Sequence, residues 1–138
     1  MNYDYSLTFI GTYIALVTLL VQALVAATSK AKQPGAIPGK IDEHLSHNSF
    51  VFRAHRTFMN SLENMPLFIG SVFLGVFSGA HAKWLGILVI TYAVARIVHM
   101  ILYYAIATET NPSPRSYFFG IALLAQIGIL GLVGVALI

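Results

Sequence analysis

Long runs of hydrophobic residues dominate the chain. Three of these runs, 5–29, 64–82 and 116–138, contain no Asp, Glu, Lys or Arg over 25, 19 and 23 residues. A helix of about 20 apolar residues is long enough to span the hydrocarbon core of a bilayer. The runs lack the regular alternation of polar and apolar positions that is typical of outer-membrane strands. The pattern therefore predicts an all-α integral membrane protein, a four-helix bundle.

Polar connections divide the hydrophobic pattern into four expected helices. The expected ranges are about 6–28, 46–79, 83–108 and 115–137, within one four-transmembrane-helix domain over 1–138. The first connection, 29–45, holds three Lys, two Pro and two Gly, a composition typical of a loop. The second helix is longer than a bilayer requires, so its first turns should extend into water.

The composition supports a membrane protein and excludes several kinds of site. Hydrophobic residues make up 57% of the 138 residues and charged residues only 9%, against about a quarter charged in soluble domains. There is no Cys, so disulfides, thiolate metal sites and a Cys nucleophile are excluded. The eight Lys and Arg form no extended basic patch, and no nucleic-acid partner is expected. His44, His47 and His55 fit no standard metal-ligand spacing, and loop histidines are usually solvated, so no metal site is expected.

The basic residues gather at two of the three connections. Arg53 and Arg56 follow the three Lys of the first connection, and Arg115 follows the third connection, whereas the second carries a single Lys. By the positive-inside rule, the first and third loops are expected to be cytoplasmic. The first hydrophobic run follows Asp4 instead of a basic segment and exceeds the length of a signal-peptide core, so it is expected to be a retained helix.

A stripe of polar residues enters the second expected helix, and a second series lies in the third. The stripe consists of Arg53, Arg56, Asn60 and Glu63, and the series consists of Arg96, His99 and Tyr103. Spacings of three and four residues keep each set on one narrow face of a helix. A mid-membrane Arg costs at least about 2.5 kcal/mol on insertion scales, so Arg96 must face protein or water. Glu63 is the only carboxylate inside an expected span, and we predict that it pairs with Arg96.

Two interpretations of these polar residues are open. The pair of Glu63 and Arg96 could simply join two helices, but the other polar residues around it would be unnecessary for that purpose. A donor-rich cleft open to the cytoplasm would suit a small, polar, anionic ligand. Arg115 and Ser116 begin the fourth helix, where a guanidinium and free helix N–H groups also favour negative charge, although Arg115 is equally an ordinary positive-inside anchor. The candidate binding residues are Arg53, Arg56, Asn60, Glu63, Arg96, His99 and Tyr103.

Three segments carry motifs of a known family. The first is RAHRTFMNSLENMPLF, 53–68, in which Arg56, Asn60, Glu63 and Pro66 fit R-x-x-x-N-x-x-E followed closely by Pro. The second is ARIVHMILY, 95–103, and the third is PRS, 114–116. Together they resemble the MAPEG superfamily, the membrane-associated proteins in eicosanoid and glutathione metabolism. The second segment is similar to the third helix of the prostaglandin E and leukotriene synthases of that superfamily.

The resemblance implies a homotrimer that binds glutathione between neighbouring subunits near the cytoplasmic face. The binding residues that it implies are Arg56, Asn60, Glu63, His99 and Tyr103, with Lys30 or Lys32 from the neighbouring subunit. Arg115 would be the catalytic residue beside the sulfur, with Ser116 next to it. A guanidinium close to a thiol raises the thiolate fraction at neutral pH, so Arg115 would activate glutathione.

The activity that the resemblance implies is that of a membrane-bound glutathione transferase with glutathione as co-substrate. A lipophilic electrophile or a lipid hydroperoxide would enter from the membrane lipid, and hydroperoxides would be reduced to alcohols. Thr57, Asn64 and Phe119 depart from residues used in some branches, so the specialised eicosanoid activities are not expected. Two alternatives stay open, a non-catalytic member that binds lipid or a partner protein and a small transporter or channel subunit. A bacterial inner membrane is expected rather than the endoplasmic reticulum.

Overall fold

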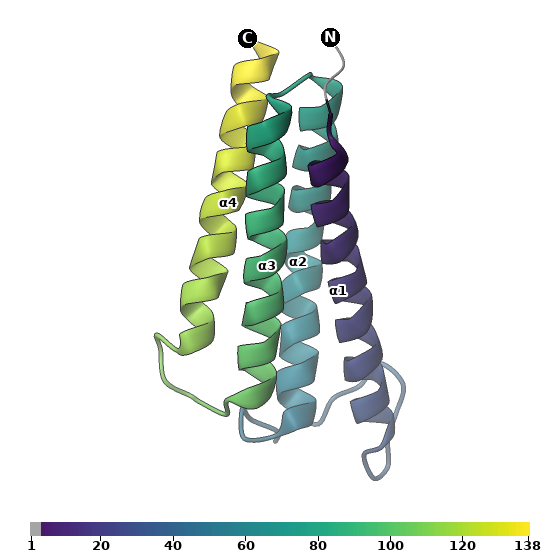
Figure 1. Cartoon of the computed structure of the whole chain (residues 1–138). Coiled ribbons are helices and arrows are strands. Elements are labelled where there is room, and N and C mark those ends of the chain that lie inside the picture. The colour runs from purple at the N-terminus through teal and green to yellow at the C-terminus, as the bar shows by residue number, and fades with distance from the viewer. Residues whose placement is uncertain (1–3) are drawn as a thin grey trace.

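The computed structural model describes residues 4–138 and consists of four long helices. These are α1 (Ser6–Ala31), α2 (Phe50–Phe77), α3 (Ala82–Ala105) and α4 (Pro114–Leu137). The helices run alternately up and down, so that the α1–α2 and α3–α4 connections lie at one end of the bundle (Figure 1). No strand occurs in 4–138, and the expected all-α four-helix bundle is confirmed. Residues 1–3 of the expected domain lie outside the described part.

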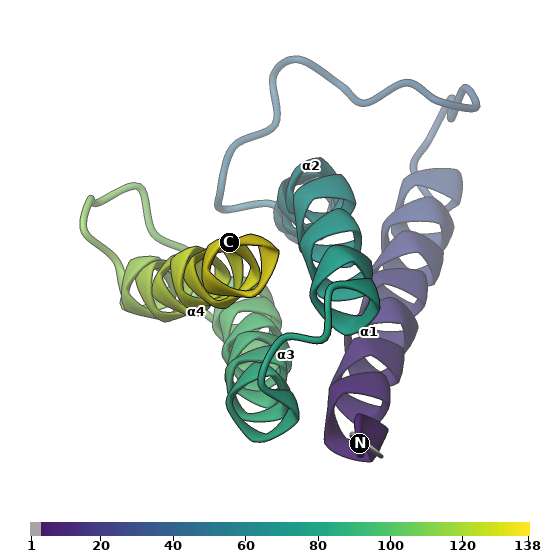
Figure 2. The ribbon, with the colours of Figure 1, turned by 90° about the horizontal axis from the view of Figure 1, so that it is seen from above.

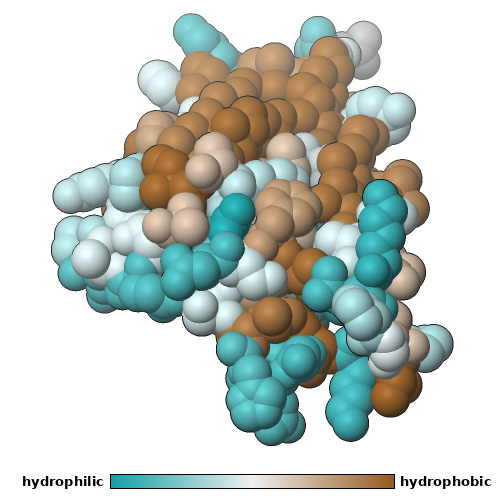
Figure 3. Space-filling view, turned by 90° about the horizontal axis from the view of Figure 1, so that it is seen from below, coloured by the Kyte–Doolittle hydropathy of each residue, from teal (hydrophilic) through white to brown (hydrophobic). Residues whose placement is uncertain are grey.

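The helix surfaces are suited to a membrane. By length and composition, α1, α3 and α4 could each cross a bilayer. The longest helix, α2, has 28 residues and runs alongside the others (Figure 1), but Arg53, Arg56 and Glu63 in its first half make it more polar. Figure 3 looks onto the end that carries both connections, where hydrophilic residues gather over the loops. We call this the loop end of the bundle.

Several helix ends differ from the expected ones. Helix starts expected at 46, 83 and 115 lie at Phe50, Ala82 and Pro114 in the structure. Helix ends expected at 28, 79 and 108 lie at Ala31, Phe77 and Ala105. The start of α2 is later because the Ser49 N–H donates to the Ser46 carbonyl at 2.9 Å, which forms a turn, and Ser49 is extended. The end of α3 is earlier because Ile106 takes an extended conformation, with φ −115° and ψ 113°.

The core of the bundle is centred on α3. Seen from above, α1 and α4 lie on either side of α2 and α3 (Figure 2), and within 4–138 they make no contact with each other. The ring of Phe68 on α2 stacks on that of Tyr92 on α3, with centroids 4.0 Å apart and planes 9° apart. Leu85, Val89 and Ile129 are completely buried in the same cluster. This packing fixes α3 against its neighbours and so positions the polar residues that α3 carries.

A close approach between α1 and α3 makes Gly11 sensitive to substitution. A Cβ at this position would lie 2.8 Å from Cγ1 of Val89 and 3.1 Å from the backbone N of Ile90. Because the helix backbone cannot give way easily, Gly11→Ala is expected to destabilise the protein by about 1–3 kcal/mol. Thermal unfolding in detergent measures the effect. Gly131→Ala is the matched control, since its Cβ would meet nothing within 4 Å. Equal melting temperatures for the two variants would contradict the packing argument.

Candidate functional site

A buried polar cluster joins α2 to α3 in the middle of α3. Arg96 is only 4% exposed, and its Nη2 donates to Oδ1 of Asn60 and to Oγ of Ser61, each at 2.7 Å. Both acceptors come from adjacent positions of α2. The guanidinium is therefore held by neutral oxygen atoms, and it fixes the orientation of the Asn60 amide.

The predicted ion pair between Glu63 and Arg96 is wrong. Glu63 is exposed, and the one ion pair among the described residues joins His47 to Glu109. On an α-helix, positions 60 and 63 point about 60° apart, and α3 packs against the side of α2 that carries Asn60 and Ser61. The carboxylate of Glu63 is thereby directed away from Arg96.

The charged residues of α2 instead form an exposed face, which we call the α2 polar face. Glu63 follows Arg56 by seven positions, so that the two side chains point within about 20° of each other. Both are exposed, and Asn60 lies half-buried at the edge of this face. No side-chain hydrogen bond or ion pair joins Arg56 or Glu63 to any other residue of 4–138. Exposed charges are costly where they contact lipid, and no residue of 4–138 in the same protomer covers this face.

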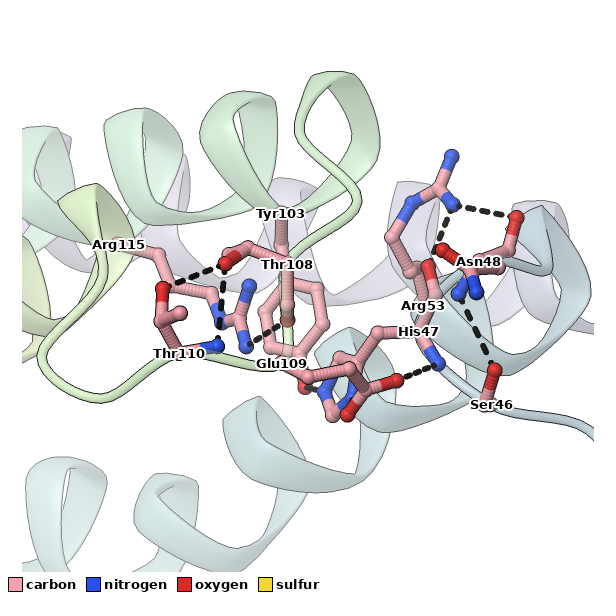
Figure 4. Close-up of polar contacts among 9 residues, drawn as sticks. All are labelled: Ser46, His47, Asn48, Arg53, Tyr103, Thr108, Glu109, Thr110 and Arg115. Atoms are coloured by element: carbon pink, nitrogen blue, oxygen red, sulfur yellow. Dashed lines mark hydrogen bonds and ion pairs between the residues drawn. The ribbon is translucent and has the colours of Figure 1, made fainter.

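A second polar cluster lies at the loop end of the bundle (Figure 4). We call it the loop-end cluster, and its members are His47, Tyr103, Glu109 and Arg115. The Nδ1 atom of His47 lies 2.8 Å from Oε2 of Glu109, and the His47 backbone N–H donates to Oε1 at 2.9 Å. The Nε2 atom of His47 lies 3.0 Å from the Tyr103 hydroxyl. The imidazole is thus held between the end of α3 and the loop that follows it.

Tyr103 is the centre of the loop-end cluster. It is 8% exposed, and the Cζ atom of Arg115 lies 4.1 Å from the centroid of its ring, a cation–π geometry. Nη2 of Arg115 also donates to the Thr108 carbonyl at 3.4 Å. The His99 ring meets the Tyr103 ring edge-on, with centroids 5.6 Å apart. The structure therefore brings together three of the expected site residues, His99, Tyr103 and Arg115.

Glu109 is exposed, yet its carboxylate is strongly engaged. Hydrogen bonds from the His47 side chain and from the His47 backbone N–H hold the pKa of Glu109 below its ordinary value, and the charges of His47 and Arg115 add to this effect. The carboxylate therefore stays ionised at neutral pH. It is available as a counter-charge for a protonated imidazole.

Two of the expected site residues have structural contacts. Nη1 of Arg53 donates to the carbonyls of His47 and Asn48 at 2.7 and 3.1 Å, and Nη2 donates to the Tyr104 carbonyl at 3.2 Å. Arg53 thus holds the start of α2 against the end of α3. The Ser116 hydroxyl accepts a hydrogen bond from the N–H of the α4 N-cap residue at 3.1 Å. Its role in capping α4 needs no ligand.

The two candidate lysines lie at the end of α1, on the loop end of the bundle. Lys30 is in the last turn of α1, and Lys32 is its C-cap residue. Lys30 lines a hollow of about 570 Å³ under the first loop, together with Lys40 and His44. Among the described residues, no side-chain hydrogen bond or ion pair joins either lysine to the buried cluster around Arg96 or to the loop-end cluster.

His47 and Glu109 are the site residues that sequence reasoning missed. They lie 62 positions apart, so no local spacing connects them, and a loop histidine gives no signal of its own. His47 lies just before α2 and Glu109 lies just after α3. The packing of α2 against α3 therefore brings the two segments together.

The fold and the two polar clusters define a helical membrane protein with a cation-rich site at one end of its bundle. A family model, that of the MAPEG family, matches residues 7–135. The chain therefore belongs to the MAPEG family, whose members are membrane proteins of glutathione and eicosanoid metabolism. The family includes glutathione transferases as well as non-catalytic members. No curated protein matches the chain.

Proposed function

We propose that the protein is a membrane-bound glutathione transferase that activates the thiol of glutathione for attack on lipophilic electrophiles. The same thiolate would reduce lipid hydroperoxides to alcohols. The observation that carries the proposal is the α2 polar face, on which Arg56 and Glu63 are exposed without a side-chain partner among the described residues. Family membership supports the same class of function.

The chemistry of glutathione matches this face. Glutathione carries two carboxylates and one ammonium group at neutral pH. The guanidinium of Arg56 would bind a carboxylate in bidentate fashion, and the carboxylate of Glu63 would accept hydrogen bonds from the ammonium group. Asn60 accepts from Arg96 through Oδ1, which leaves its Nδ2 free to donate to the tripeptide.

The proposal includes a homotrimer in which a neighbouring subunit covers the α2 polar face. The cost of exposing Arg56 and Glu63 to lipid favours such a cover. The neighbour would contribute Lys30 or Lys32, which lie at the same end of the bundle as the loop-end cluster. The proposed location is a bacterial inner membrane, with the loop end in the cytoplasm.

Arg115 is the proposed activator of the thiol. A free thiol has a pKa of about 8.5, and a neighbouring guanidinium lowers it. Arg115 is half-buried at the N-terminus of α4, where the helix dipole also favours negative charge. Its contacts with Tyr103 and Thr108 hold it in place.

Titration of glutathione into the detergent-purified protein, followed by ultraviolet thiolate absorbance, tests the proposal. Wild type is expected to give a saturable thiolate signal. Arg115→Ala should lose that signal and still bind glutathione, because the proposed binding residues lie elsewhere. Glu63→Ala should bind weakly, whereas Glu43→Ala, which removes an exposed carboxylate in the first loop, should behave as wild type. Absence of glutathione binding by folded wild type would contradict the proposal and favour a non-catalytic member.

A further inference from the structure

We infer that His47 and Glu109 form a proton relay behind Tyr103, through which the thiol proton of glutathione leaves the site. In this inference Tyr103 takes the proton from the substrate, and His47 and Glu109 are positioning residues that act through Tyr103. The inference rests on the proposed function. The inference goes beyond that function by assigning a path to the proton that thiolate formation must release.

The three groups are connected in the order that a relay requires. Glu109 binds Nδ1 of His47 at 2.8 Å, and Nε2 of the same ring lies 3.0 Å from the Tyr103 hydroxyl (Figure 4). The two carboxylate oxygens hold both the ring and the backbone N–H of His47. These contacts assign the tautomer with the proton on Nδ1, because the carboxylate can only accept. Nε2 is then the acceptor that faces the Tyr103 hydroxyl.

Exposure increases along the relay from the buried end to water. Tyr103 is 8% exposed, and the side chains of His47 and Glu109 are 22% and 58% exposed. At the buried end, the guanidinium of Arg115 lies 4.1 Å from the Tyr103 ring centroid. A sulfur held by Arg115 would therefore lie next to Tyr103. The relay joins the proposed position of the thiol to solvent.

The proton-transfer step balances within these groups. The S–H bond breaks and its proton binds the Tyr103 oxygen, while the Tyr103 O–H bond breaks and that proton binds Nε2 of His47. The products are a thiolate beside Arg115, a neutral Tyr103 and an imidazolium beside the Glu109 carboxylate. The imidazolium then returns one proton to water and becomes neutral again.

Other charged and titratable groups also face the relay. Arg115 from α4 and Arg53 from α2, which donates to the His47 carbonyl, repel a positive charge on the His47 ring, and the carboxylate of Glu109 from the loop opposes that repulsion. His99 on α3 meets Tyr103 edge-on. The carboxylate of Glu109 is therefore the one described group that directly stabilises a protonated His47, and removal of its charge should slow the transfer.

Stopped-flow mixing of glutathione with the full-length protein, followed by thiolate absorbance and a pH indicator, tests the relay. His47→Gln is expected to slow thiolate formation at least about a hundredfold at neutral pH, the low end of a general-base effect. The final thiolate amplitude should persist, because Arg115 sets it.

Substitutions of Glu109 keep the test independent of folding, since this residue is exposed in a loop. Glu109→Gln removes the charge and should slow the transfer, whereas Glu109→Asp keeps the charge and should retain most of the rate. Glu43→Gln is the control for the loss of an exposed carboxylate and should leave the rate unchanged.

The outcomes separate the relay from the proposed function. A wild type that forms thiolate, with unchanged rates in His47→Gln and Glu109→Gln, would overturn the relay alone. Equal slowing by Glu109→Gln and Glu109→Asp would show that the pair merely holds two loops together, and would also overturn the relay. A wild type that forms no thiolate would overturn the relay together with the proposed function.

Discussion

Replacement of Arg115 by alanine is expected to lower kcat/KM for conjugation of glutathione to a lipophilic aryl halide by about 10²–10³-fold at neutral pH, the usual effect of removing one preorganised charge-stabilising group. Only the thiolate attacks the electrophile, and in the proposed function the guanidinium of Arg115 stabilises that thiolate. Arg115 is held by the Tyr103 ring at 4.1 Å and by the Thr108 carbonyl, so its charge needs no rearrangement before it acts. Initial rates in detergent or in liposomes measure the effect.

Two controls distinguish thiol activation from loss of structure at Arg115. Raising the pH to about 9 should largely restore the rate of Arg115→Ala, because free thiols ionise with a pKa of about 8.5. Arg115→Lys keeps the charge but loses the planar stacking on Tyr103, and its rate should lie between those of wild type and Arg115→Ala. A variant as active as wild type, or one whose lost activity does not return at high pH, would contradict the assignment.

The number, order and type of the helices could be predicted from the sequence, because the constraint is local. An apolar segment in lipid must satisfy its backbone hydrogen bonds internally, and a helix does so without help from other segments. The helix ends were predicted less well. The start of α2 at Phe50 depends on the turn between Ser46 and Ser49. The pattern of hydrophobic residues along the chain does not indicate where such a turn forms.

The positions of the polar faces could also be predicted, but not the contacts that they make. The spacing of Arg56, Asn60 and Glu63 placed them on one side of α2, where Arg56 and Glu63 are exposed and Asn60 lies half-buried at the edge. The rotation of α2 against α3 decides whether Asn60 or Glu63 meets Arg96. That rotation depends on packing such as the stack of Phe68 on Tyr92, which couples residues on different helices.

Residues that share a stripe can have different roles, and the sequence does not separate them. Arg53 lies on the same periodic face as Arg56, yet the guanidinium of Arg53 binds three backbone carbonyls while Arg56 is exposed. The carbonyls that Arg53 binds belong to the end of the first loop and to α3. A role as structural clamp is visible only once these backbones are placed together.

Arg96→Met is expected to weaken glutathione binding by about ten- to a hundredfold, because the hydrogen bond from a charged donor that orients Asn60 is worth about 1.5–3 kcal/mol. Arg96 donates to Asn60 at 2.7 Å from a buried position, and without it the amide is free to rotate. The melting temperature should change little, since an apolar side chain also removes the desolvation cost of a buried charge that has no counter-ion, which offsets the lost hydrogen bonds. Titration calorimetry and thermal unfolding measure the two effects separately.

Ser61→Ala is the matched control for Arg96→Met, because it removes the second acceptor of the same Nη2 atom and leaves the bond to Asn60 intact. Its glutathione affinity should stay close to that of wild type. If Arg96 acts only as a link between α2 and α3, both variants should lower the melting temperature and neither should change the affinity. Weakened binding in Arg96→Met alone would instead show that a buried charge, which forms no hydrogen bond with Arg56 or Glu63, organises the α2 polar face by fixing Asn60.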